Sequence, residues 1–109
     1  MNDAIEDAIE KEIIQKGLTA PRITPEQIDA AIVKEQYHVF EGTTYTSCLL
    51  TLKNGFTVHG GSACASSENF NKEIGEKIAR ENAKQKIWPL MGYLLREKMH
   101  ENELHNSLC

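Results

Sequence analysis

The dipeptide Asn54-Gly55 constrains this chain more than any other feature, because it stands between two runs of strand-forming residues. A two-residue type I′ hairpin turn needs positive φ at both central positions, and Asn-Gly meets that need well. The flanking residues 44–53 and 56–60 are therefore predicted to be antiparallel strands. Aromatic and β-branched residues at 37–41 predict a strand before them, so we expect a three-stranded antiparallel β-meander.

A two-residue loop would also set the register of the hairpin. Lys53 would face Phe56, and each pair farther from the turn would follow from that one. Both faces of the sheet would then carry apolar side chains: Cys48, Leu50 and Leu52 on one, and Leu49, Phe56 and Val58 on the other. A sheet with one face in water alternates more cleanly. We therefore expect helices over one face and a second subunit over the other.

Two helices are expected before the meander. Residues 3–16 place isoleucines at helical spacing among acidic residues, and Gly17 is a natural stop. Thr24-Pro25-Glu26-Gln27 is typical of a helix start, because Thr24 can cap, Pro25 suits the first helical position and Gln27 completes a capping box. This second helix is predicted to be short and to end near Glu35.

A long helix is expected from Phe70 to about Met99. Pro89 lies inside it, and its ring would clash with the carbonyl of Gln85, so a kink or break is predicted there. Its buried stripe is predicted to consist of Ile74, Ile78, Ile87, Met91, Leu94 and Leu95.

The expected fold is thus α+β: a three-stranded antiparallel β-meander packed with a long, Pro-interrupted C-terminal helix and two N-terminal helices. The 109 residues fit a single domain, with an acidic helix at 1–17, a core at 24–100 and a flexible polar tail at 101–109.

Charge and composition exclude several classes of function. A net charge of -4 argues against a duplex nucleic acid partner, which needs a basic surface to displace counterions. No stretch is apolar enough to span a membrane, and the acidic N-terminus lacks the features of a signal peptide. The three cysteines, Cys48, Cys64 and Cys109, fit neither a disulfide framework nor a zinc site, so a cytoplasmic location is expected.

No catalytic residues, metal ligands or cofactor are predicted. The sequence has no phosphate-binding loop, dinucleotide fingerprint or zinc-protease motif. Cys64 stands in the small-residue segment 60–67, and His59 could in principle reach it, but no local signature supports a Cys–His pair. The small-residue segment is typical of a connector, although small side chains also let a ligand approach the backbone.

Several separate motifs between Thr24 and Glu97 resemble the small phage protein family known as Gp49/gene 66. They cover about two thirds of the chain and occur in this order: Thr24-Pro25-Glu26-Gln27-Ile28, Leu52-Lys53-Asn54-Gly55-Phe56-Thr57-Val58, Ser62-Ala63-Cys64, Asn69-Phe70, the stretch from Glu73 to Ala83, Ile87-Trp88-Pro89-Leu90 and Gly92-Tyr93-Leu94-Leu95-Arg96-Glu97. Gly60-Gly61 departs from the Gly-Glu expected before Ser62, so an acidic side chain is lost there.

The resemblance implies a function. The family looks like the one that contains the phage Thoeris anti-defence type 1 proteins, which bind cyclic ADP-ribose isomers made by bacterial immune enzymes and sequester them without cleavage. Cyclic trinucleotides, the signals that anti-CBASS proteins counter, are implied at a second site. The implied assembly is a homo-oligomer, either a dimer or a hexamer built from dimers, in the cytoplasm of an infected bacterial cell.

Such a binding protein needs an aromatic side chain for the base and polar or cationic groups for ribose and phosphate. Phe70 is the candidate for stacking, although a plain core role is equally typical of its position. Arg80 and Arg96 are candidates for phosphate, with a solvated helix surface as the alternative. Asn82, close to the apolar stripe, and Thr44, on the second strand, are candidate hydrogen-bonding groups.

Two other functions remain open from the sequence. A phage accessory module that docks on a host or phage protein would bind no small molecule and would lose its partner when exposed apolar residues change. An enzyme would release a modified product, and Cys64→Ala would abolish it. A sponge would instead lose its ligand when Arg80 or Arg96 becomes alanine, while it keeps its oligomer.

Overall fold

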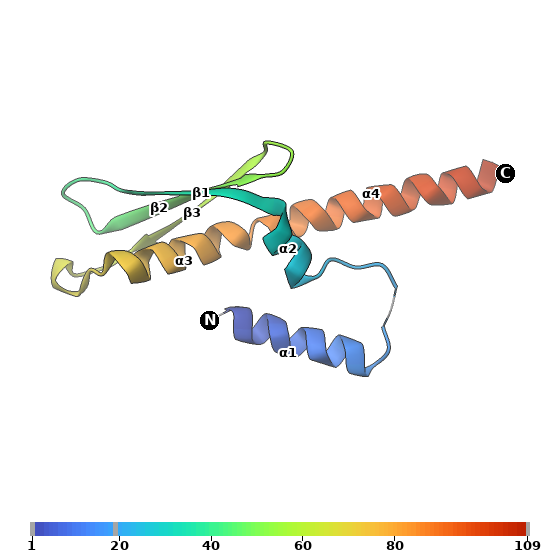
Figure 1. Cartoon of the computed structure of the whole chain (residues 1–109), viewed down its shortest axis with the longest axis horizontal. Helices are drawn as coiled ribbons and strands as arrows, with labels where there is room; N and C mark the ends of the chain where they lie inside the picture. Colours follow the sequence, from blue (N-terminus) through green and yellow to red (C-terminus); the bar gives the residue numbers. More distant parts are fainter. Residues whose placement is uncertain (1, 19, 109) are drawn as a thin grey trace.

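The computed structural model describes residues 2–18 and 20–108, and it confirms the α+β class (Figure 1). The three strands form one antiparallel sheet in the order β1-β2-β3. The elements in chain order are α1 (Asn2–Gln15), α2 (Pro25–Ala31), β1 (Ile32–Val39), β2 (Tyr45–Leu52), β3 (Thr57–Ala63), the short 3-10 helix η1 (Ser67–Asn69), α3 (Lys72–Lys84) and α4 (Ile87–Leu108).

Helix α3 covers one face of the sheet, which we call the inner face (Figure 1). Apolar side chains from alternate positions of β2 and β3 fill the space between them, as the period of a strand requires. The core consists of Ile28, Cys48, Leu50, Leu52, Val58, Ala79, Ala83 and Ile87. Ile28 reaches it from α2, whose start shows the predicted capping box between Thr24 and Gln27.

The contact between β3 and α3 is unusually close because of glycine. A Cβ atom built on Gly60 would lie 2.3 Å from the backbone nitrogen of Ala83 and 2.6 Å from the carbonyl oxygen of Ala79. No side chain fits at those distances, so the two backbones touch directly. The helix therefore presents Gly75, Ala79 and Ala83 to the sheet, all of them buried.

This close packing overturns the predicted buried stripe of α3. Ile74 is 55% exposed and Ile78 is 40% exposed, whereas Ile87 is fully buried as predicted. Large side chains on the sheet-facing side would hold the helix too far away for Gly60 to meet its backbone. The stripe of small residues faces inward instead, and the isoleucines face outward.

The hairpin register was also predicted wrongly, by one residue. Leu52 donates its backbone N–H to the carbonyl of Phe56 at 2.8 Å, which leaves three residues in the loop. Gly55 has a φ of +89° and Asn54 does not have a positive φ. This is the three-residue loop with glycine in the left-handed region, an alternative that Asn-Gly serves equally well.

The corrected register moves Val58 to the inner face, opposite Leu50. The outer face is consequently more polar than predicted, with Lys34, Gln36, His38, Ser47, Thr51, Thr57 and His59 beside Leu49 and Tyr45. The expectation of a second subunit over this face rested on its apolar residues, and the corrected register removes that reason.

Helix α2 ends at Ala31, four residues before the predicted end at Glu35, because β1 must pair along the whole length of β2. Ile32 already lies opposite Leu52. The β-branched pair Ile32-Val33 suits an extended backbone, so local propensity agrees with the earlier boundary.

The long C-terminal helix is interrupted as predicted, slightly before Pro89. The chain turns at Gln85 and Lys86, and Pro89 is the third residue of α4. A proline in a first turn removes no helical hydrogen bond, since those N–H groups have no partner within the helix. Helix α4 then continues to Leu108, through residues expected to form an irregular tail, and Cys109 lies outside the described residues.

Helix α4 projects beyond the sheet (Figure 1). The radius of gyration is 17.8 Å, compared with about 13 Å expected for a compact domain of this length. None of the described helices is long and apolar enough to cross a membrane.

The close approach at Gly60 makes a direct prediction. Gly60→Ala should destabilise the protein by about 2–3 kcal/mol, because the new methyl group meets backbone atoms that cannot move independently. The matched control is Gly92→Ala in α4, where nothing lies within 4 Å of the added Cβ. That substitution should stabilise the helix by up to about 1 kcal/mol. Urea unfolding of both variants measures the difference, and equal effects would contradict the packing described.

Candidate functional site

Two hollows flank Phe70 on the inner side of the sheet. The first, here called the β1-side hollow, has a volume of about 300 Å³ and is lined by Tyr37, His38, Val39, Phe70, Lys72 and Glu76. The second, the β3-side hollow, has a volume of about 180 Å³ and is lined by Thr44, Ser62, Ala63, Cys64, Asn69, Phe70, Asn71, Ile74, Gly75 and Ile78. Phe70 belongs to both linings, so the two spaces lie on either side of this residue.

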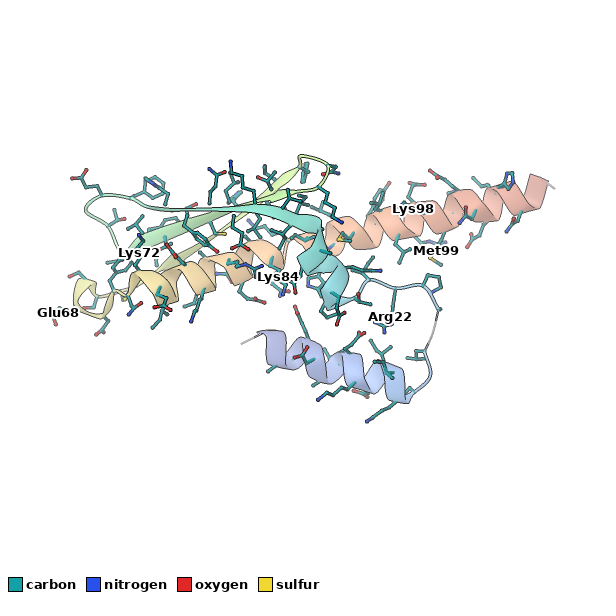
Figure 2. The ribbon with its side chains drawn as sticks, in the orientation of Figure 1. Arg22, Glu68, Lys72, Lys84, Lys98 and Met99 are labelled. Carbon is teal, nitrogen blue, oxygen red and sulfur yellow. The ribbon has the colours of Figure 1, made fainter. Side chains whose placement is uncertain are left out.

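The position of Phe70 follows from two consecutive helix caps. The Ser66 side chain accepts a hydrogen bond from the N–H of Glu68 at the start of η1. The Asn71 side chain accepts one from the N–H of Ile74 at the start of α3, at 3.0 Å. Phe70 lies between these caps in an extended conformation, half-buried at the N-terminus of α3. Lys72 is the first residue of that helix (Figure 2).

Thr46 lies on the inner face beneath this region, near the start of the central strand β2. Its side chain is fully buried, and its hydroxyl has no hydrogen-bond partner among the described residues. A Cβ built on Gly75 would lie 2.8 Å from Thr46 Oγ1 and 3.9 Å from Phe70 Cε1. An unpaired buried hydroxyl costs about 1–3 kcal/mol, so its presence here needs an explanation.

Thr44, a predicted ligand-binding residue, lines the β3-side hollow together with Phe70. Its hydroxyl donates a hydrogen bond to the carbonyl oxygen of Cys64. The proton of Thr44 is therefore already used, and the oxygen is left to accept a hydrogen bond from a ligand.

Arg80 lies at the β1 edge of the sheet rather than in either hollow lining. Its Nε donates to Glu35 Oε2 at 2.9 Å, and its terminal nitrogen lies 4.0 Å from Asp29 Oδ1. Burial raises the pKa of Glu35, but the hydrogen bonds from Tyr37 and Arg80 and the charge of Arg80 outweigh it, so the net pKa is lowered. In the free protein Arg80 thus pairs with carboxylates.

Asn82 and Arg96 also lie outside both linings. Asn82 donates from Nδ2 to the carbonyl of Gly61 at 2.9 Å, which satisfies its amide with backbone. Arg96 is on α4, 65% exposed, with its terminal nitrogen 3.6 Å from Glu103 Oε1. Within one chain the structure therefore brings together Thr44 and Phe70 of the five predicted residues.

Sequence reasoning missed Thr46 and Gly75, although each had a signal. Cys48 and Leu50 were predicted to lie on one face of the sheet. Alternate residues of a strand share a face, so the same pattern predicts that the Thr46 side chain lies on that face too. Gly75 is a glycine inside a helical segment, which is typical of a close packing contact.

A further cavity lies elsewhere, between α1 and the junction of α2 with α4. It has a volume of about 390 Å³ and is lined by Ile5, Glu6, Ile9, Glu10, Ile13, Ile23, Pro25, Gln85 and Trp88. Its charged lining residues are acidic, so it does not suit an anionic ligand. Helix α1 is held beside it by charge: Arg22 donates two hydrogen bonds to Glu10, at 2.6 and 2.8 Å.

The structure does not bring together Cys64 and His59, the two residues considered for a Cys–His pair. His59 is exposed and pairs with Leu49 on the outer face, whereas the Cys64 thiol donates to the carbonyl of Ser66 at 3.1 Å. Among residues 2–18 and 20–108, no group of three or more His, Cys, Asp or Glu side chains could hold a metal ion.

Comparison with known proteins gives one match. The model of the family described as phage protein (N4 Gp49/phage Sf6 gene 66) matches residues 23–99. No curated protein and no solved structure matches. The matched region begins just before α2, so it includes the sheet, both hollows and most of α4, and it leaves α1 outside.

The ion pairs of Arg80 predict a pH-dependent stability. Arg80→Ala should cost about 1 kcal/mol at pH 7, because the ion pairs of Arg80 with Glu35 of β1 and Asp29 of α2 are lost. The pKa of Glu35 is lowered by folding, so its contribution is present above its ordinary pKa, near 4.3, and is lost as the pH falls through the lowered value.

The difference between wild type and Arg80→Ala should therefore shrink below about pH 4 in urea unfolding. The control is Lys77→Ala, whose partner Glu73 is 3.7 Å away with both side chains exposed. It should change stability by less than about 0.5 kcal/mol at any pH. A difference for Arg80→Ala that stays constant from pH 7 to pH 3 would contradict the role given to Glu35.

Proposed function

Because the chain belongs to the phage protein (N4 Gp49/phage Sf6 gene 66) family, we propose that it is an anti-defence protein that sequesters cyclic nucleotide immune signals. The proposed ligands are cyclic ADP-ribose isomers and, at a second site, cyclic trinucleotides. The protein binds them in the cytoplasm of the infected bacterial cell and does not degrade them.

The observation that carries this proposal is the place of Phe70, between two hollows at the N-terminus of α3. An aromatic ring stacks on a nucleobase, and the positive end of a helix dipole attracts phosphate. The hollows measure about 300 and 180 Å³, and together they fall within the usual size of small-molecule sites.

Polar groups around the ring suit the other parts of a nucleotide. The β1-side hollow offers Lys72 as a donor and Glu76 as an acceptor for ribose hydroxyls, and the Tyr37 hydroxyl, which already donates to Glu35, can accept. The β3-side hollow offers hydroxyl and amide groups without any charged lining residue. Binding without turnover needs no nucleophile and base in contact, so sequestration fits this arrangement.

We also propose that the active form is a homo-oligomer built from dimers. Helix α4 exposes Leu90, Tyr93, Leu94 and Leu104, and it extends the chain well beyond a compact shape. A second copy would cover these side chains. It would also bring the exposed Arg96 of one chain toward a neighbour, and this gives Arg96 a route to a ligand that a single chain does not offer.

Native mass spectrometry with cyclic ADP-ribose isomers and cyclic trinucleotides tests the binding. The expected result is one nucleotide or more per oligomer, recovered unaltered after heating. Phe70→Ala should weaken binding about 5- to 150-fold, since stacking on one base is worth about 1–3 kcal/mol. The control is Phe56→Ala, a ring that is 54% exposed next to the hairpin loop and should not affect binding.

An absence of bound nucleotide at micromolar concentrations would refute the sponge. The exposed apolar side of α4 would then favour the alternative of a module that docks on a host or phage protein. Recovery of a cleaved nucleotide would point to an enzyme instead.

The oligomer has its own test. Leu94→Glu should raise the dissociation constant of the dimer at least about tenfold, because a buried anchor at an interface contributes about 2 kcal/mol or more. Light scattering across a dilution series measures this constant. His100→Glu, an exposed change on the same helix, is the control. A wild-type protein that is monomeric at high micromolar concentration would contradict the proposed assembly.

A further inference from the structure

The strand register places Thr46 between the two hollows. Thr46 pairs with Val39 on one side and with Ser62 on the other, and directly paired residues share a face. Val39 lines the β1-side hollow and Ser62 lines the β3-side hollow. The inner face thus runs from one hollow to the other through Thr46, the residue between them that is completely covered.

Gly75 lies directly over Thr46, and Phe70 lies beside Gly75. A Cβ atom built on Gly75 would lie 2.8 Å from Thr46 Oγ1 and 3.9 Å from Phe70 Cε1. Gly75 lies on α3 against the sheet, where the backbone cannot move without separating the helix from β3. The Phe70 side chain belongs to the segment between two caps and is half-buried, so rotation of its ring is the motion that would join the hollows.

We propose that Phe70 is the gate of a closed polar subsite, and that the Thr46 hydroxyl is its recognition group for a phosphate oxygen of the ligand. The unpaired hydroxyl is explained, because its partner arrives only when the ring has turned. This inference rests on the proposed function and assigns a binding atom and a moving part to the same site.

The charges around the site favour phosphate on the β3 side. The β1-side hollow contains the carboxylate of Glu76 as well as Lys72, and a carboxylate repels an anion. The β3-side lining has no charged residue and includes Asn71 and Gly75 from the N-terminal turn of α3, where the helix dipole is positive. A phosphate oxygen that enters from this side reaches Thr46 past Ser62 and Phe70.

The test is a double-mutant cycle in the full chain, with Thr46→Val as the isosteric loss of the hydroxyl. In wild type without ligand, Thr46→Val should raise the melting temperature by about 4–8 °C, because an unpaired buried hydroxyl is removed. In the Phe70→Ala background, water reaches the hydroxyl, so the same substitution should bring no such gain. An equal rise in both backgrounds would show that Phe70 does not cover Thr46 and would overturn the gate.

Binding gives the second readout, by calorimetry with cyclic ADP-ribose. Thr46→Val should weaken binding about tenfold or more, although it makes the free protein more stable, whereas Thr46→Ser should keep affinity within about threefold. The control is Thr51→Val, the same change on the outer face of the same strand, which should alter neither quantity. Wild-type affinity in Thr46→Val would overturn the recognition role.

The two proposals fail differently. If the wild-type protein binds neither cyclic ADP-ribose nor a cyclic trinucleotide, sequestration is refuted, and inorganic phosphate becomes the probe of the subsite. A shift of the melting temperature with phosphate in wild type, lost in Thr46→Val, would still support the subsite. No shift together with additive stability effects would overturn it.

Discussion

The direct contact of the backbones of β3 and α3 decides how the rest of the molecule is arranged. Gly60 leaves room for the helix backbone at Ala79 and Ala83, at distances that no Cβ would tolerate. The helix must then turn its small residues toward the sheet and its isoleucines outward. The same orientation brings Gly75 over Thr46 and beside Phe70, so the candidate site is a consequence of the packing contact.

At the other end of α3, ion pairs join the elements in addition to the apolar core. Lys84 is 3% exposed, and its Nζ lies 3.2 Å from Asp29 of α2 and 3.9 Å from Glu6 of α1 (Figure 2). Burying an ammonium group is costly unless carboxylates surround it, and losing one partner of such a pair is strongly destabilising. Arg80, one turn earlier, shares Asp29 and adds Glu35. In the free chain, Lys84 and Arg80 therefore connect α3 to carboxylates of α1, α2 and β1.

The geometry also indicates which interactions would produce affinity and specificity in the proposed function. Affinity would come from a stacking ring, a helix N-terminus and a buried hydroxyl, all at one end of α3. Specificity would come from desolvation, since a ligand that turns Phe70 without pairing with Thr46 would leave the hydroxyl unsatisfied. Helix α4 points away from this end with apolar side chains exposed, so in the proposed oligomer its Arg96 would reach a ligand only on a neighbouring chain.

The sequence by itself determined the features that depend on a few neighbouring residues. The capping box of Thr24 and Gln27, the three strands and the interruption of the C-terminal helix all follow from local backbone preferences. It did not determine the hairpin register, because Asn54-Gly55 serves loops of two and of three residues, and one residue of difference moves Val58 to the other face. Only the tertiary structure decided that α3 buries Gly75 rather than Ile74, that Arg80 pairs with Glu35, and that Thr46 and Phe70 both lie beside Gly75. Each of these depends on contacts between segments far apart in the chain, where packing distances and partners, and not local propensity, set the outcome.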